Sequence, residues 1–212
     1  MPDSARRCLI LAEVLLVYGA ITIYIWVVRY HYRWAAWVIL GWILVSQWII
    51  YRDGFSTLGL RLDNLWPAFG ETVRLVWPGL GVLLLAVVVR YWLLEPDPAR
   101  GLRPFPVFYF VSAFVQQYVL QGFFHRRLSR IFPNSGWTPL LVALIFSTLH
   151  TPNPPLIVTT FVAGFYSAWL FRRYPNLIPL SLAHAVFGTL LARSLPGWLI
   201  RNMRVGPGYY LT

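Results

Sequence analysis

Residues 8–28 run CLILAEVLLVYGAITIYIWVV, with Glu13 as the only charged side chain in the stretch. An α-helix rises about 1.5 Å per residue, so about 20 such residues span the roughly 30 Å hydrocarbon layer of a bilayer. Arg6 and Arg7 precede the run, as in a secretory or twin-arginine signal, but the run is longer than a typical signal core and no small-residue cleavage site follows it. The stretch predicts a retained membrane helix.

Six more apolar segments follow, at 34–51, 76–94, 105–125, 138–151, 155–171 and 177–193. The whole chain is 58% hydrophobic and only 12% charged, whereas about a quarter of the residues in a soluble domain are charged. We therefore predict an all-α fold, a polytopic transmembrane helical bundle of about seven membrane segments. The fifth segment is short and is expected to cross only if its neighbours shield it.

Residues 62–75 mix apolar and charged side chains, which favours an interfacial helix on the bilayer, with a loop as the open alternative. Thr138 and Pro139 predict a helix start, as an N-cap followed by proline at the first helical position. Pro152, Pro154 and Pro155 predict a turn between the fifth and sixth segments.

The net charge of +11 comes from 18 arginines against 7 acids, with no lysine. The arginines lie at the ends of the apolar segments and not in one patch, which indicates anchoring at lipid headgroups and argues against nucleic acid as a partner. Arginines beside the first, fourth and sixth segments predict a cytoplasmic N-terminus by the positive-inside rule. Over the whole chain, ten arginines fall on that side of the membrane and eight on the other. The absence of lysine suggests a bacterial source, and hence the inner membrane. Cys8 is the only cysteine and cannot form an intrachain disulfide.

Polar residues fall at bilayer depth on three of the segments. Gln116, Gln117 and Gln121 are on the fourth, His150 ends the fifth, and His184 lies in the seventh. Counting 1.5 Å per residue from each helix end puts Gln116, His150 and His184 in one layer near the midplane. Polar groups at this depth favour a functional site. Hydrogen bonds that only hold the helices together are the alternative.

The order and spacing of these residues resemble the CPBP family of intramembrane peptidases, which includes the CAAX prenyl proteases. That family carries Glu-Glu-x-x-x-Arg, then Phe-x-x-x-His, then His-x-x-x-Asn or Asp, on successive membrane helices. Here the corresponding stretches are 116–121, 146–150 and 184–188, and the lead-in at 58–61 and the continuation at 122–128 are also similar. The resemblance covers about residues 55–195. It implies a two-helix N-terminal membrane region at 1–54, a CAAX-protease-like membrane domain at 55–195 and a C-terminal tail at 196–212.

The resemblance implies catalytic positions, and this chain departs from the family at several of them. The family's first glutamate is the general base on water and falls at Gln116; the first histidine, which assists it, falls at His150. The second histidine and the Asn or Asp, which stabilise the oxyanion, fall at His184 and Gly188. An amide cannot accept a proton as a carboxylate does, and Gly188 offers no side-chain donor.

Gln117 and Gln121 fall where the family has a glutamate and an arginine four residues apart. Removing one charge of a buried ion pair strands the other, at about 3–5 kcal/mol. Replacing the whole set with glutamine removes the charges and keeps hydrogen-bonding capacity, so the losses look coordinated.

These features leave two main hypotheses. The first is a non-cleaving or strongly impaired homologue, a pseudopeptidase that binds a membrane-embedded or prenylated peptide or a lipid-linked group. The second is an active intramembrane endopeptidase, a hydrolase of peptide bonds that uses His150 and His184. A structural or transport subunit is a weaker third. Membrane lipid is an expected partner. No cofactor is predicted, and no metal, because His150 and His184 supply two ligands and His125 would be a third only if its helix were displaced.

Overall fold

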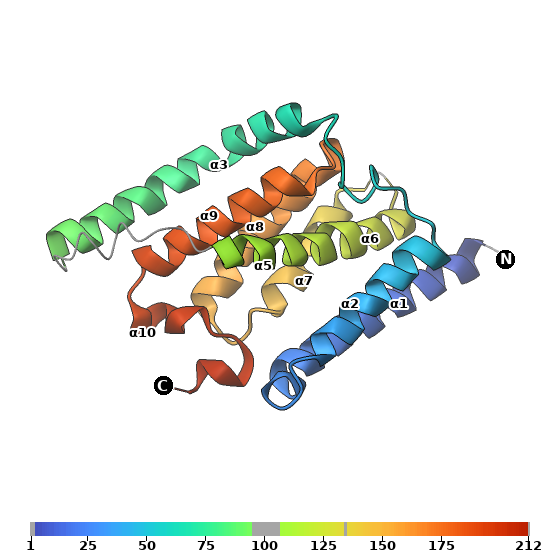
Figure 1. The fold of residues 1–212 in the computed structure, drawn as a ribbon, viewed down its shortest axis with the longest axis horizontal. Helices are drawn as coiled ribbons and strands as arrows, with labels where there is room; N and C mark the ends of the chain where they lie inside the picture. The colour runs from blue at the N-terminus through green and yellow to red at the C-terminus, as the bar shows by residue number, and fades with distance from the viewer. Residues whose placement is uncertain (1–2, 95–106, 134, 212) are drawn as a thin grey trace.

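The computed structural model describes residues 3–94, 107–133 and 135–211, and every regular element in these ranges is a helix (Figure 1). The α-helices are α1 (Asp3–Trp26), α2 (Ala35–Val45), α3 (Leu65–Val88), α5 (Val107–Gln117), α6 (Arg126–Ile131), α7 (Trp137–Thr148), α8 (Pro154–Arg173), α9 (Leu177–Ser194) and α10 (Gly197–Ile200). Three π-helical stretches extend them, at Ser46–Ile50, Val89–Leu94 and Tyr118–His125. Short 3₁₀ turns lie at Val28–Tyr30, Arg201–Met203 and Gly206–Tyr209.

Each of the seven predicted membrane segments is largely helical where the structure describes it. Five helices in the described ranges are long and apolar enough to cross a membrane, namely Asp3–Trp26, Leu65–Leu94, Val107–Ile131, Pro154–Arg173 and Leu177–Ser194. Ala35–Ile50 and Trp137–Thr148 are apolar but shorter. Within the described ranges, this membrane protein is therefore all-α and has five helices of spanning length, fewer than the seven segments that hydropathy alone predicts.

The helix starts differ from two predictions. No break separates residues 62–75 from the third segment: α3 begins at Leu65 and continues past Pro78 to Val88, so neither a separate interfacial helix nor a loop describes the stretch. Helix α7 begins at Trp137 with Gly136 in the cap position, so the predicted cap at Thr138 is wrong by two residues. The proline turn is confirmed, because α7 ends at Thr148 and α8 begins at Pro154 with proline in its first turn.

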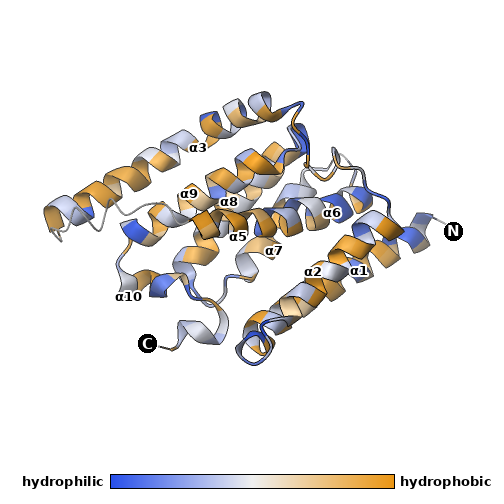
Figure 2. Ribbon diagram, in the orientation of Figure 1, coloured by the Kyte–Doolittle hydropathy of each residue, from blue (hydrophilic) through white to orange (hydrophobic). Residues whose placement is uncertain are grey.

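The exterior of the bundle is apolar, as expected for helices surrounded by lipid. Leu16, Trp37, Leu85 and Phe108 are each more than 60% exposed, and hydrophobic residues predominate along α1, α2 and α3 (Figure 2). The buried core contains Phe123 and Phe124 of the π-helical stretch and apolar residues of α7, α8 and α9. The bundle thus packs around Tyr118–His125.

An ion-pair network joins the N-terminal helix pair to α6. The Arg127 guanidinium, 0% exposed, pairs with Glu13 of α1 at 3.1 Å and with Asp53 at 2.9 Å, and it donates to the Ser46 hydroxyl at 2.8 Å. Asp53 also pairs with Arg130 at 2.6 Å. A buried arginine therefore holds the Glu13 carboxylate inside the bundle. We call these five residues the Arg127 network.

The C-terminal tail, which sequence patterns did not assign, is ordered against the turn between α7 and α8. The Asn153 amide, 0% exposed, donates to the carbonyl oxygens of Ile200 at 2.8 Å and Arg204 at 3.0 Å. The Gly206 N–H donates to the Thr151 carbonyl at 2.8 Å. The tail thus packs against Thr151 and Asn153, which follow His150 in the chain.

Candidate functional site

Both of the predicted site histidines contact one aromatic ring. Phe146 of α7 has its ring centroid 4.8 Å from that of His150 and 5.6 Å from that of His184 of α9, both in edge-on geometry. The structure therefore brings these two histidines together, as the depth estimate predicted. We call His150, Phe146 and His184 the histidine cluster.

In the neutral form of each histidine, a hydrogen bond fixes which ring nitrogen carries the proton. The Phe146 carbonyl can only accept, so His150 Nδ1, 2.7 Å away, carries the proton and leaves Nε2 with a free lone pair. The Gln117 amide nitrogen lies 3.3 Å from His184 Nδ1 and can only donate, so the proton of neutral His184 is on Nε2. One ring thus offers an acceptor and the other a donor.

Gln117 and Gln121, both buried, form a hydrogen-bonded ladder across the bundle. Gln121 Nε2 donates to Gln117 Oε1 at 3.3 Å and to the Ser167 hydroxyl of α8 at 3.0 Å. Gln117 in turn donates to His184. The ladder therefore connects α8 to α9 through uncharged groups. Gln117 and Gln121 contact each other at i, i+4, as their spacing predicts.

Gln116 is not part of this ladder. Its Nε2 donates to the Ser112 hydroxyl one turn earlier in α5, at 3.2 Å, on an exposed part of the helix. The residue in contact with His184 is Gln117. Of the three residues predicted to share one layer, Gln116 therefore makes no hydrogen bond to either histidine, and Gln117 bonds to His184 instead.

Tyr109 fills the space that a side chain at Gly188 would need. A Cβ atom built on Gly188 would lie 2.1 Å from the Tyr109 hydroxyl oxygen and 2.9 Å from Cζ. The Tyr109 ring also meets His184 edge-on, with the centroids 6.4 Å apart. A phenolic hydroxyl from α5 therefore occupies the place of the side chain that α9 lacks.

Sequence reasoning missed Tyr109, although a signal was present. Tyr109 precedes Gln117 by eight residues, two helical turns, so the two side chains share a face of α5, with buried Ala113 between them. Ser167 was missed because nothing in the sequence of α8 separates it from an ordinary helix-bonded serine.

His125 lies apart from the histidine cluster. Its ring is 5.4 Å from the Phe171 ring of α8, edge-on, and neither ring nitrogen has a hydrogen-bond partner. Within the described ranges, no group of three or more His, Cys, Asp or Glu side chains is placed to hold a metal ion.

The chemistry open to the histidine cluster is that of neutral groups. His150 Nε2 can accept a proton, and His184 Nε2–H can donate a hydrogen bond. Glu13 is the one carboxylate within the membrane segments predicted from the sequence. It pairs with Arg127 and accepts a hydrogen bond from Ser46, so it is not available to the histidine cluster. The amide and hydroxyl groups of the ladder can form hydrogen bonds with the backbone of a bound peptide, but they carry no charge.

The comparisons with known proteins agree with the motif pattern. Residues 98–190 match the family model of the type II CAAX prenyl endopeptidase Rce1-like proteins. No curated protein and no solved structure matches the chain. The match includes the glutamine helix, the Phe146–His150 pair and His184, which are the residues of the site described above. This chain is therefore a membrane protein that carries a type II CAAX prenyl endopeptidase Rce1-like domain at residues 98–190.

Proposed function

We propose that this protein is a pseudopeptidase, which holds a membrane-embedded or prenylated peptide, or a lipid-linked group, at the histidine cluster without cutting it. The observation that carries the proposal is the uncharged Ser167–Gln121–Gln117–His184 ladder. Hydrolysis needs a group that takes a proton from water at working pH, and an amide does not. The ladder keeps the donors and acceptors that would bind a peptide backbone.

An apolar pocket on the same helix as the glutamines supports the binding role. It has a volume of about 240 Å³ and lies between α2 and α5, with Leu44, Trp48, Phe114 and Tyr118 in its lining. Tyr118 directly follows Gln117 in the chain, but its hydroxyl faces Gln47 and Trp48 whereas Gln117 faces His184, so the pocket adjoins the glutamine helix on a different side from the ladder. An isoprenoid or another lipid chain has the apolar surface that such a lining buries well.

Active endopeptidase is the alternative, and two observations favour it. Neutral His150 presents an unprotonated Nε2, which can act as a general base. The Tyr109 hydroxyl lies where Gly188 lacks a side chain, so the oxyanion donor missing from α9 can come from α5. In this mechanism His150 takes the proton of the attacking water, while His184 and Tyr109 stabilise the oxyanion.

Cleavage assays separate the two functions. The purified full chain is incubated with a library of prenylated and membrane-embedded peptides, beside the His150→Ala and Gln116→Glu variants. The pseudopeptidase proposal expects no product from the parent, with retained binding of the peptides. Cleavage by the parent that disappears in His150→Ala eliminates the proposal and establishes the endopeptidase.

A variant with the family residues restored tests whether this fold can support cleavage. The Gln116→Glu, Gln117→Glu, Gln121→Arg and Gly188→Asn changes return the motif residues, but an Asn side chain at 188 collides with the Tyr109 hydroxyl. The set therefore needs Tyr109→Ala as a fifth change. Cleavage by this variant and none by the parent supports the loss of activity through the substituted groups.

We also propose that all seven apolar helices cross the membrane, with the N-terminus cytoplasmic in a bacterial inner membrane. The support is the alternation of the helices, which brings the starts of α1, α3, α7 and α9 to one end of the bundle (Figure 1), and the arginines of α6 and α8 at that end. Accessibility of Cys8 to a membrane-impermeant thiol reagent in intact and in opened cells tests the orientation.

A further inference from the structure

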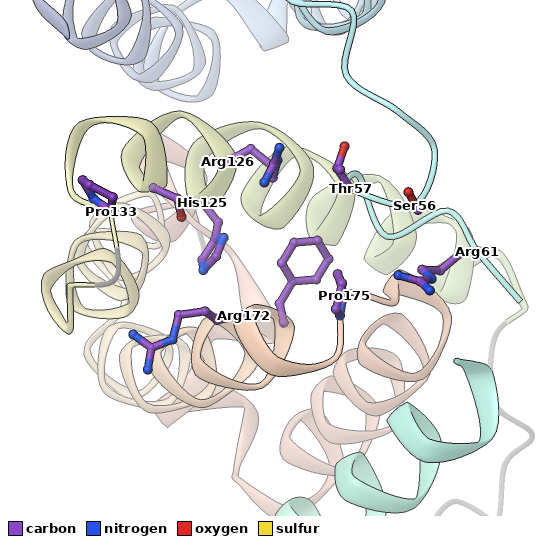
Figure 3. A pocket seen from close by; sticks show the side chains of 10 residues that line it. Ser56, Thr57, Arg61, His125, Arg126, Pro133, Arg172 and Pro175 are labelled. Carbon is purple, nitrogen blue, oxygen red and sulfur yellow. The ribbon is translucent and has the colours of Figure 1, made fainter. Parts of the chain in front are cut away.

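A pocket lies at the arginine-rich end of the bundle, away from the histidine cluster. It has a volume of about 320 Å³, and Arg61, Arg126, Arg172, His125, Ser56 and Ser129 are among the residues that line it (Figure 3). These residues come from the loop before α3, from the π-helical stretch with α6, and from the end of α8. The pocket is therefore built by three segments far apart in the sequence.

The lining of this pocket is positively charged. It contains three guanidinium groups and, among the described residues, no carboxylate. Arg61 pairs with Asp63, and Arg126 lies 3.7 Å from Asp53. Asp53, however, is shared with Arg127 and Arg130.

Counting the surroundings gives a surplus of positive charge. The guanidinium groups of Arg61, Arg126, Arg127, Arg130 and Arg172 stand against the carboxylates of Glu13, Asp53 and Asp63. Five cations against three anions leave a local excess of two. An anion in the pocket would balance this excess.

His125 is an independent sign that a ligand is expected. Its side chain lines the pocket, the residue is only 4% exposed, and both ring nitrogens lack a hydrogen-bond partner. The Nε of Arg126 is also buried without a partner. Buried polar groups are nearly always hydrogen-bonded, so these atoms indicate an oxygen-bearing ligand between them.

From these observations, we propose that this pocket binds a phosphate group, presented by an anionic phospholipid headgroup or as a soluble phosphate ion. Arginines bind phosphate through paired N–H donors in a planar fork, and the Ser56 and Ser129 hydroxyls add donors for the remaining oxygens. The pocket lies where membrane helices end, which is the depth of lipid headgroups. The proposal is independent of whether the histidine cluster cleaves a peptide.

Binding is measured on the purified full chain in neutral detergent, as the rise in the thermal unfolding midpoint with added probe. The probes are inorganic phosphate, with chloride at equal ionic strength as its reference, and phosphatidylglycerol, with diacylglycerol as the reference that lacks a phosphate. A rise with phosphatidylglycerol alone identifies a lipid headgroup as the source. A rise with inorganic phosphate as well identifies a site open to the soluble ion. If neither probe raises the midpoint above its reference, the proposal is wrong.

Arg172→Gln and Arg173→Gln are a matched pair of variants. Both remove one charge at the end of α8, but Arg173 does not line the pocket and lies over the Trp169 ring, 5.1 Å from its centroid. We expect Arg172→Gln to weaken binding about tenfold, or about 1.4 kcal/mol, and Arg173→Gln to leave it within about twofold. Equal losses in the two variants would show a general charge effect and overturn the proposal.

Ser129→Leu tests the pocket without changing any charge. The larger side chain fills part of the cavity, so we expect the phosphate-dependent rise to be lost while all arginines remain. An unchanged rise in Ser129→Leu places the phosphate outside this pocket and contradicts the proposal. This variant also covers the case in which Arg172→Gln fails to fold.

Discussion

The close approach of Tyr109 to Gly188 makes these two residues dependent on each other. A Cβ at residue 188 would lie 2.1 Å from the Tyr109 hydroxyl oxygen, so Gly188→Ala must displace the tyrosine from its place beside His184. Overpacking of this kind costs about 1–3 kcal/mol. We expect Gly188→Ala to lower the stability of the purified protein by this amount, measured by unfolding with SDS in mixed micelles.

The Tyr109→Phe background is the control for this prediction. Removing the hydroxyl eliminates the shortest of the contacts and leaves the ring carbons at about 3 Å, so the cost of Gly188→Ala should fall but not vanish. If Gly188→Ala costs the same with and without the hydroxyl, the two side chains do not compete for this space.

The sequence predicts most residues of the site but not Tyr109 and Ser167, which contact them. The i, i+4 spacing correctly pairs Gln117 with Gln121, and the depth count correctly brings His150 and His184 together. It does not place Gln116, because depth fixes the layer of a residue and not the direction in which its helix face points. The catalytic or binding role of these residues stays a prediction.

At the scale of the element, the π-helical stretch explains why His125 leaves the glutamine face. A regular α-helix would align Gln117, Gln121 and His125 at i, i+4 and i+8. From Tyr118 to His125 the backbone is π-helical, with hydrogen bonds to the fifth residue and more residues per turn. The longer turn rotates His125 toward Phe171 and the phosphate pocket. The side-chain pattern of residues 118–125 does not predict the switch from α-helix to π-helix, because that switch depends on packing by the neighbouring helices.

Asn153 has two roles at the start of α8, and its variants can separate them. Its side-chain oxygen accepts from the Leu156 N–H as the helix cap, at 3.4 Å, and its amide donates to Ile200 and Arg204 of the tail. Asn153→Ser keeps a capping oxygen but cannot reach the tail, whereas Asn153→Ala loses both. We expect Asn153→Ala to be less stable than Asn153→Ser by about 1 kcal/mol, the value of a cap.

Both variants should also release the tail. The two tail carbonyls lose their buried donor, at about 1 kcal/mol each, so trypsin should cut after Arg201 and Arg204 faster than in the parent. A tail that stays resistant to trypsin in Asn153→Ser would show that the Asn153 bonds do not hold it. The chain pattern gave no hint of this role, because a Pro-Asn-Pro sequence predicts only a turn.

At the scale of the whole molecule, the Arg127 network is the principal polar contact between α1 and the Rce1-like domain. Glu13 and Arg127 are 114 positions apart in the chain, and an acid within an apolar run looks like a snorkelling residue near a membrane surface. The sequence therefore predicts the helices of both regions but not the buried pair that joins them. The boundary between the regions at residue 54 remains a prediction, and Asp53 beside it is bound to Arg127 and Arg130.

The network predicts an unequal effect of removing its charges. In Arg127→Met, Asp53 keeps Arg130 at 2.6 Å, whereas Glu13 loses its arginine and keeps hydrogen-bond donors without charge, such as the Ser46 hydroxyl. Breaking a buried pair from one side costs about 3–5 kcal/mol because an uncompensated charge stays inside. We expect Arg127→Met to lower the free energy of unfolding by this amount, measured by unfolding with SDS in mixed micelles.

Glu13→Gln added to Arg127→Met should then recover part of the loss, since the amide still accepts from Ser46 and carries no charge. Glu13→Gln alone should cost less than Arg127→Met, because Arg127 keeps Asp53 at 2.9 Å. If the double variant is as unstable as Arg127→Met, the cost comes from lost packing over the Tyr51 ring, which the guanidinium covers at 3.8 Å, and not from the stranded carboxylate. The order of the three variants thus decides whether charge or packing holds the N-terminal helices against the domain.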